Sequence, residues 1–342
     1  MAGARPVTGI LADNGKPASC STRFYYFFCV IFLLRAVDTS LQVGNMFEKV
    51  LVALDFSAYS QKIFDCISEI PGIQEVVLLH VVDATHPSKL GWTTGPYLEN
   101  ARILMAEKKE ALEHLGFHVR VSVDVLVNVI TQGTVSQAIL EAAETHRVSL
   151  IIMGARGINP IQELLLGSVS SAVLRQAKTN VLVMHFNPGR EDADAGCDTS
   201  NRNLFSRLLV PTDFSPSAGD TLSFIRTIPS VKEVILLHVV NRAESQPEIE
   251  AAVQDAQARL ADMRKDLSGS DFAVKHHIRV GDPTEMTLSV AREDDVSLIA
   301  MSAYGTDWFK EMLVGSTTFT VVRRTRKPVL VIRSRQDNEH PR

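Results

Sequence analysis

The chain has 342 residues, of which 45% are hydrophobic and 22% charged, and its formal net charge is −4. That length fits two domains of roughly 150 residues better than one. The small negative charge gives no basic surface for nucleic acid or anionic lipid, so neither is expected as a partner. The four cysteines include no Cys-x-x-Cys pair, which argues against a zinc site or a disulfide framework and favours a reducing cytoplasm.

The N-terminal segment contains an apolar run, residues 24–34, between Arg23 and Arg35. A membrane-spanning helix needs about 20 apolar residues, so this run is too short, and no small-residue cleavage site clearly follows it. We expect residues 1–45 to be an extension that is either disordered or precedes the true start at Met46. A weak membrane anchor is the less favoured alternative.

After Met46, short β-branched apolar runs alternate with segments of helical spacing. The predicted strands cover 49–54, 75–82, 118–127, 148–153 and 180–185, and the predicted helices cover 57–70, 99–115, 134–146 and 167–177. Alternating strands and helices predict an α/β fold with a doubly wound, Rossmann-like parallel sheet and right-handed crossovers. Ligands of such sheets bind at the carboxyl ends of the strands.

The chain contains an internal repeat. The segment Val50-Leu-Val-Ala-Leu-Asp-Phe-Ser57 recurs as Leu208-Leu-Val-Pro-Thr-Asp-Phe-Ser215, an offset of 158, and later matches have an offset of 148. A period this long indicates two tandem domains, since solenoid repeats are 20 to 50 residues long. We therefore predict a first repeat at 46–187, a polar linker at 188–204 and a second repeat at 205–335, each with a five-stranded sheet.

A glycine-spaced loop follows the fourth predicted strand. Gly154, Gly157 and Gly167-Ser168 form the pattern G-x2-G-x9-G-S, and the next helix opens with hydroxyl residues. Such a loop places backbone N–H groups and the positive end of a helix dipole beside an anion. A glycine loop alone is more often a simple turn, but its position between strand and helix favours a phosphate site.

Both repeats resemble domains of the universal stress protein family, and the chain from Met46 resembles a tandem member. The resemblance rests on Asp55-Phe-Ser57, on Leu78-Leu-His-Val-Val82 and on the glycine loop. It implies a five-stranded parallel α/β domain that pairs through its last strand, and ATP binding in members that keep the loop. Magnesium could accompany the ATP.

The resemblance also implies which residues bind the nucleotide. Asp55 would hold the ribose, because a carboxylate accepts two hydroxyl hydrogen bonds, and the glycines would allow close approach or positive φ. For Asp55, capping of the following helix is the structural alternative. The implied first site is Ala53, Leu54, Asp55, Val81, Met153, Gly154, Arg156, Gly157, Gly167, Ser168, Val169 and Ser170.

The second repeat carries an altered copy of this site. Ser302 stands where Gly154 stands in the first repeat, and Tyr304 replaces Arg156. We therefore expect nucleotide mainly in the first repeat, and weak binding or none in the second. The weaker second site would be Pro211, Thr212, Asp213, Val239, Gly305, Gly315, Ser316 and Thr317.

Three functions remain open at this point. The favoured one is a cytoplasmic, ATP-binding regulatory module of the stress response with no assigned catalytic residue or metal ligand. The others are a slow Mg-dependent ATPase and a nucleotide-free structural protein that acts through protein partners. The closing strands, 180–185 and 328–333, are matched apolar edges, so we also expect the two domains to pair with each other, or the chain to form a homodimer.

Overall fold

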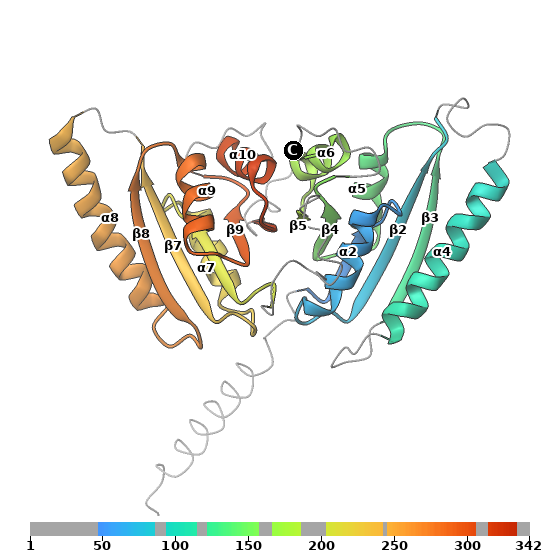
Figure 1. The fold of residues 1–342 in the computed structure, drawn as a ribbon, viewed down its shortest axis with the longest axis horizontal. Coiled ribbons are helices and arrows are strands. Elements are labelled where there is room, and N and C mark those ends of the chain that lie inside the picture. Colours follow the sequence, from blue (N-terminus) through green and yellow to red (C-terminus); the bar gives the residue numbers. More distant parts are fainter. Residues whose placement is uncertain are drawn as a thin grey trace, which may run out of the picture. The chain divides into compact units, whose positions relative to one another are not determined.

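The computed structural model describes residues 47–85, 94–114, 122–156, 166–185, 203–241, 245–305 and 314–333. The predicted N-terminal extension and residues 188–202 of the predicted linker lie outside these residues. Within them, each repeat alternates strands and helices as the sequence predicts (Figure 1). The α/β fold class is therefore confirmed.

The first repeat contains five strands and their connecting helices. In chain order they are β1 (Lys49–Ala53), α2 (Ala58–Cys66), the 3₁₀ turn η1 (Ile67–Glu69), β2 (Glu75–Asp83), α4 (Thr94–His114), β3 (Ser122–Ile130), α5 (Val135–Thr145), β4 (Leu150–Gly154), α6 (Ser168–Gln176) and β5 (Asn180–Met184). The second repeat has the same order: β6 (Arg207–Pro211), α7 (Pro216–Ile225), β7 (Glu233–Val240), α8 (Gln246–Asp266), β8 (Ala273–Val280), α9 (Pro283–Glu293), β9 (Leu298–Ser302), α10 (Ser316–Arg324) and β10 (Val329–Ile332).

All ten strands belong to one sheet, in the order β3-β2-β1-β4-β5-β10-β9-β6-β7-β8. Strand pairing is parallel throughout each repeat, and only the join between β5 and β10 is antiparallel. In that join Leu182 lies opposite Leu330. These two leucines are equivalent in the two repeats, so an internal twofold axis passes close to them. Both repeats accordingly take part in one compact unit of the chain.

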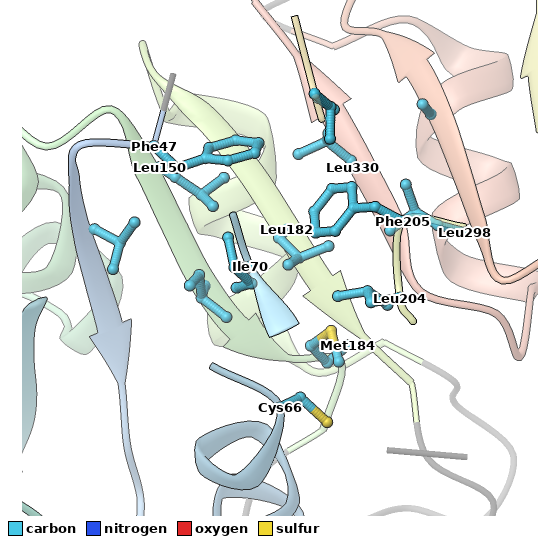
Figure 2. Close-up of a cluster of buried hydrophobic side chains, with 14 of the residues drawn as sticks. Phe47, Cys66, Ile70, Leu150, Leu182, Met184, Leu204, Phe205, Leu298 and Leu330 are labelled. Carbon is cyan, nitrogen blue, oxygen red and sulfur yellow. The ribbon is translucent and has the colours of Figure 1, made fainter. Parts of the chain in front are cut away.

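The helices cover the sheet on both faces. Apolar side chains of α2, α4, α7 and α8 pack on one face, and those of α5, α6, α9 and α10 pack on the other. Figure 2 shows the first of these cores where the repeats meet. Phe47 of the first repeat lies 5.8 Å, between ring centroids, from its equivalent Phe205 in the second repeat. The two repeats therefore share a continuous core across the β5–β10 join.

One strand differs from its predicted position. The third strand is expected at 118–127; its predicted start lies outside the described residues, whereas β3, described as Ser122–Ile130, continues beyond the predicted end. β3 is an edge strand that pairs only with β2, from Glu75 opposite Ser122 to Asp83 opposite Ile130. The end of β3 therefore follows the end of β2. The apolar periodicity of the third strand's own sequence does not show where its partner ends.

Candidate functional site

Each repeat brings the carboxyl ends of its central strands together at one place on the sheet. In the first repeat the strand order reverses between β1 and β4, and Asp55 and Gly154 stand at the ends of those strands. In the second repeat β6 and β9 bring Asp213 and Ser302 to the equivalent place. Open α/β sheets bind ligands at such a switch point. We call these two places the first crevice and the second crevice.

Asp55 shapes the turn that leads into α2. Its Oδ1 accepts hydrogen bonds from the Ser57 backbone N–H (3.0 Å) and from the Ser57 hydroxyl (2.6 Å). Ser57, and not Asp55, is the N-cap, because its Oγ accepts the Ser60 N–H. Phe56 between them has φ +59°, a strained value for a residue with a side chain. The Oδ2 of Asp55 takes no hydrogen bond from the described residues.

Asp213 repeats this arrangement in the second crevice. Its Oδ1 accepts the Ser215 N–H at 3.0 Å, and Ser215 caps α7 through the Ala218 N–H. Phe214 has φ +61°. Since both repeats have this uncommon positive φ in the turn before the helix, the fold fixes the position of the carboxylate in each repeat.

The sequence puts His80 and His238 at equivalent strand positions among apolar neighbours, where we expect hydrogen-bonded core residues, and both histidines carry such a hydrogen bond. Nδ1 of His80 lies 2.8 Å from the Leu54 carbonyl oxygen, and Nδ1 of His238 lies 2.9 Å from that of Thr212. Burial lowers the pKa of His80, against the opposing hydrogen bond to Leu54. His238 differs from the expectation in one respect, because it is only half-buried and lines the second crevice.

The glycine loop of the first repeat joins β4 to α6. Gly167 is the N-cap of α6 and supplies no side-chain cap, whereas α2 and α5 are capped by Ser57 and Thr134. The first N–H groups of α6 therefore remain for another acceptor. The Gly167 N–H itself donates to the Ala155 carbonyl at 2.6 Å.

The described glycines of this loop have no positive φ, so close approach is the one of the two expected reasons that applies to them. Gly167 has φ −73° and Gly315 has φ −63°, and Gly154 and Gly305 also lie outside the left-handed region. Glycine occupies these positions because other atoms lie close to where a Cβ would stand. A Cβ on Gly154 would lie 3.0 Å from the Arg156 carbonyl oxygen and 3.2 Å from Cδ1 of Ile63.

The two serines at the start of α6, Ser168 and Ser170, differ in burial. Ser170 is buried and donates to the Gly154 carbonyl oxygen at 2.7 Å, so its hydroxyl is used within the loop and is not the phosphate donor considered for it. Ser168 and Val169 are exposed, and Arg156 is half-buried. Ala53 and Val81 are half-buried at the ends of β1 and β2, whereas Leu54 and Met153 are buried. Gly157 lies outside the described residues.

The second loop accommodates Ser302 in place of Gly154. The Ser302 hydroxyl donates to the Tyr304 carbonyl oxygen at 2.7 Å. The residue equivalent to Ile63 is Thr221, whose side chain is smaller. The larger residue at position 302 is therefore accompanied by a smaller neighbour, Thr221. Its hydroxyl also hydrogen-bonds the loop backbone, so the second loop accommodates Ser302.

The second crevice is a cavity of about 770 Å³. All eight residues predicted for the weaker second site line it. Sequence reasoning missed two parts of this cavity. One is the wall formed by α8, which includes Glu248, Asp255 and Arg259, and the other is a stack of planar side chains. In this stack the Arg259 guanidinium lies 4.2 Å from the Phe214 ring centroid, and Phe214 stacks on His238 at 4.3 Å. In the sequence these α8 residues look like the polar face of an amphipathic helix, and that pattern does not predict contacts with a cavity.

Two further residues near the loops were also missed. Arg333 follows β10 where His185 follows β5, and both side chains are buried between the repeats. Arg333 donates to the Tyr304 hydroxyl at 2.9 Å and to the Leu174 carbonyl oxygen at 2.8 Å. The exchange was visible in the repeat alignment: Arg156 with His185 in the first repeat becomes Tyr304 with Arg333 in the second.

His185 is held as a neutral side chain. Burial first, and then the nearby positive charge of Arg156, lower its pKa to about 3, although a hydrogen bond to the Val322 backbone opposes them. Within the described ranges, no group of three or more His, Cys, Asp or Glu side chains is arranged to hold a metal ion. No described helix is long and apolar enough to cross a membrane.

The fold defines a tandem α/β protein whose two repeats share one sheet, and comparison with known proteins gives its family. The universal stress protein family pattern matches residues 46–185 and 204–333. The chain belongs to the universal stress protein family. It is 31% identical over 155 residues to Universal stress protein MJ0577 of Methanocaldococcus jannaschii, covering 38% of this chain and 96% of that protein.

Two comparisons extend over both repeats. A universal stress protein of Mycolicibacterium smegmatis is 24% identical over 304 residues, covering 84% of this chain and 97% of that protein. The crystal structure of a universal stress protein from Archaeoglobus fulgidus superposes with a TM-score of 0.64 at 24% identity, covering 84% of this chain and 98% of the other. This structural likeness supports the fold.

Proposed function

We propose that the protein is a cytoplasmic, ATP-binding regulatory module of the stress response, with the nucleotide held mainly in the first crevice. Magnesium would accompany the phosphates of the bound ATP. Cys66 is buried and takes part in no disulfide, which is compatible with the reducing compartment proposed here.

One arrangement carries the proposal. Asp55 presents an unengaged Oδ2 at the end of β1, and the uncapped start of α6 stands at the end of β4, the neighbouring strand. A carboxylate suits the hydroxyls of a ribose, and a helix N-terminus suits a phosphate. The exposed hydroxyl of Ser168 adds a donor at that terminus.

The preference for the first crevice rests on charge. Arg156 stands in the first loop, only half-buried, where a guanidinium can approach a phosphate. The second loop has Tyr304 there, and the nearby cation, Arg333, donates to groups between the repeats. The first crevice is therefore the better match for a polyanion.

Pairing of the repeats is the second part of the proposal. β5 and β10 join as antiparallel strands, which covers both closing edges within one chain. We propose that this intramolecular pair serves in place of a homodimer, and that nucleotide in one repeat alters the surface shown to protein partners.

The test uses the full-length chain and the matched variants Asp55→Ala and Asp213→Ala. ATP affinity is measured by isothermal titration calorimetry with magnesium, and nucleotide carried through purification is released and identified by chromatography. We expect ATP binding to be lost in Asp55→Ala and kept in Asp213→Ala. Unchanged ATP binding in Asp55→Ala would contradict the assignment to the first crevice.

Two other outcomes would replace the proposal. Steady ATP turnover with magnesium, abolished by Asp55→Ala, would identify a slow ATPase. A wild-type chain that is empty after purification, and that neither binds ATP in calorimetry nor gains thermal stability from it, would indicate a structural protein without nucleotide.

A further inference from the structure

The ends of α6 and α10 carry a concentration of positive charge that lies outside both crevices. These helices and the residues that follow them, 168–179 and 316–328, contain lysines and arginines but no aspartate or glutamate. The whole chain, in contrast, has a formal net charge of −4. We call the surface at these two helix ends the junction surface, and its cations are Arg175, Lys178, Arg323, Arg324, Arg326 and Lys327.

Both repeats contribute to the junction surface. The guanidinium of Arg175, in α6, lies 3.8 Å from the ring centroid of Phe319, in α10. Arg323 follows Phe319 by four residues, so it stands on the same side of α10, about one turn further along. Arg175 and Arg323 are equivalent positions in the two repeats, at the offset of 148. These two arginines therefore meet at the boundary between α6 and α10, one from each repeat (Figure 1).

Part of this positive charge is neutralised at the flanks. α5 lies beside α6, and α9 lies beside α10. Carboxylates of α5, of α9 and of the turn after α9 pair with three of the cations. These ion pairs are Lys178–Glu144, Arg324–Glu285 and Lys327–Asp295. The charge that remains available is therefore limited to the other three cations of the junction surface.

Arg175, Arg323 and Arg326 are the three cations that remain. All three side chains are exposed, and none of them forms an ion pair or a hydrogen bond within the part of the chain that the structure describes. A cation in the last turn of a helix stabilises the helix dipole, but Arg326 lies beyond the end of α10. The ring of Phe319 holds the Arg175 guanidinium by its face, which leaves the N–H groups at its edge for an acceptor.

A carboxylate is the acceptor that suits these guanidinium groups, because arginine binds carboxylates through two parallel hydrogen bonds. The available positive charge covers a small area between ion-paired flanks, which suits a few carboxylates better than a long nucleic acid strand. The net negative charge of the chain also opposes the approach of nucleic acid or an anionic membrane. We propose that the junction surface binds an acidic segment of a protein partner, which contacts Arg175 of one repeat and Arg323 of the other together.

This inference deepens the proposed function, because it rests on the chain acting through protein partners and names the surface that receives them. α6 connects the two sites, since it begins at the glycine loop of the first repeat and ends at the junction surface. Binding of an acidic segment to the arginines does not itself require nucleotide. The surface can therefore be tested without ATP.

The test measures the affinity of the full-length chain, without nucleotide, for a fluorescently labelled deca-glutamate peptide by anisotropy at low salt. Arg175→Gln and Arg323→Gln should each weaken binding about threefold, because each removes one cation from the shared site. The triple variant that adds Arg326→Gln should weaken binding roughly tenfold or more. Its ATP affinity in calorimetry should equal that of the wild-type chain, since none of these residues lies in a crevice.

The matched control carries Arg226→Gln, Lys232→Gln and Arg264→Gln. These changes remove the same charge from exposed positions outside the junction surface. The control should leave the peptide affinity unchanged, and urea unfolding verifies that both triple variants remain folded. A labelled thymidylate decamer and phosphatidylserine vesicles are the comparison ligands, and we expect both to bind more weakly than the peptide.

Four results would overturn the inference. They are no peptide binding to the wild-type chain, equal loss of binding in both triple variants, an effect of only one of the two changes Arg175→Gln and Arg323→Gln, and binding of the oligonucleotide or the vesicles as tight as that of the peptide. The nucleotide proposal for the first crevice fails separately. It fails if the wild-type chain does not bind ATP, whatever the peptide does at the junction surface.

Discussion

The carboxylate of Asp213 lies directly against Gly305. A Cβ on Gly305 would come within 2.5 Å of Oδ2 of Asp213, a separation that real Cβ atoms do not show. Asp213 also fixes the turn into α7 through the Ser215 N–H. The absence of a side chain at position 305 is therefore what lets this carboxylate remain in the second crevice.

Gly305→Ala should separate ligand binding from stability. The backbone at this position is not left-handed, and the obstructing atom is the end of an Asp side chain, so the free energy of unfolding should change by less than about 1 kcal/mol. Because the carboxylate must move, we expect the weak affinity of the second crevice for ATP to fall at least tenfold in calorimetry.

The control for this change is Gly219→Ala. Gly219 lies in α7, an added Cβ there meets nothing within 4 Å, and the residue does not line the cavity. It should stabilise the chain by about 1 kcal/mol through helix propensity and leave the affinity unchanged. Equal loss of affinity in both variants would show that Asp213 is not the cause.

Gly154→Ser should reveal how the second loop tolerates Ser302. In the first repeat the new Cβ meets Cδ1 of Ile63 at 3.2 Å, so we expect a loss of about 1 kcal/mol in the free energy of unfolding. Ile63→Val removes that methyl group at a cost of its own, about 1 kcal/mol. The double variant should lose less than the sum of the two, measured as a double-mutant cycle in urea.

Ser302→Gly is the reciprocal substitution in the second repeat. It removes the hydroxyl that donates to the Tyr304 carbonyl oxygen, with Thr221 already small at the neighbouring position. Strict additivity of Gly154→Ser and Ile63→Val would contradict the steric explanation of the glycine.

The sequence predicted most of the fold because the repeat doubled each signal. Apolar runs ending at Asp55 and Asp213 define β1 and β6, and Thr134 starts α5 with a capping box. The end of β3 was misjudged, since an edge strand takes its length from its partner.

The candidate site was predicted less completely, for a physical reason. Local pattern located Asp55 and the glycine loop because strand ends and helix starts are encoded locally. The positions of Arg259 and Arg333 depend on contacts with elements distant in the chain, Phe214 and Leu174 respectively. The glycine pattern was compatible with close approach or with positive φ, and the distances around Gly154 show that crowding is the reason there.

His185 should make the stability of the chain fall in acid. Its pKa is about 3 in the folded protein and 6.5 in the reference state, so below pH 6.5 the unfolded chain gains a proton that the folded chain does not. The free energy of unfolding should therefore fall by roughly 1.4 kcal/mol for each pH unit between about pH 6 and 3, and level off below. The lowered pKa of His80 acts with the same sign.

Urea unfolding at pH 7.5, 6 and 5 measures this dependence. His185→Gln should reduce the slope by roughly one proton equivalent, about 2 kcal/mol between pH 7.5 and 5. His114→Gln, at an exposed position at the end of α4, is the control for loss of a histidine. A slope in His185→Gln equal to that of wild type would refute the assignment.

Arg333 should stabilise the junction of the two repeats more than any exposed cation nearby. Its guanidinium joins the Tyr304 hydroxyl to the Leu174 carbonyl oxygen of the other repeat. Arg333→Met would leave both groups buried without that donor, and we expect a loss of about 3 kcal/mol in the free energy of unfolding. Tyr304→Phe removes one partner and should cost about 1 kcal/mol.

The double variant, Arg333→Met with Tyr304→Phe, should cost less than the sum of the single changes, because they share one hydrogen bond. Arg324→Met is the matched control. Arg324 pairs with Glu285 at the exposed end of α10, and such surface pairs contribute about 1 kcal/mol or less. If Arg333→Met costs no more than Arg324→Met, then the shared apolar core at Phe47 and Phe205, and not this guanidinium, holds the repeats together.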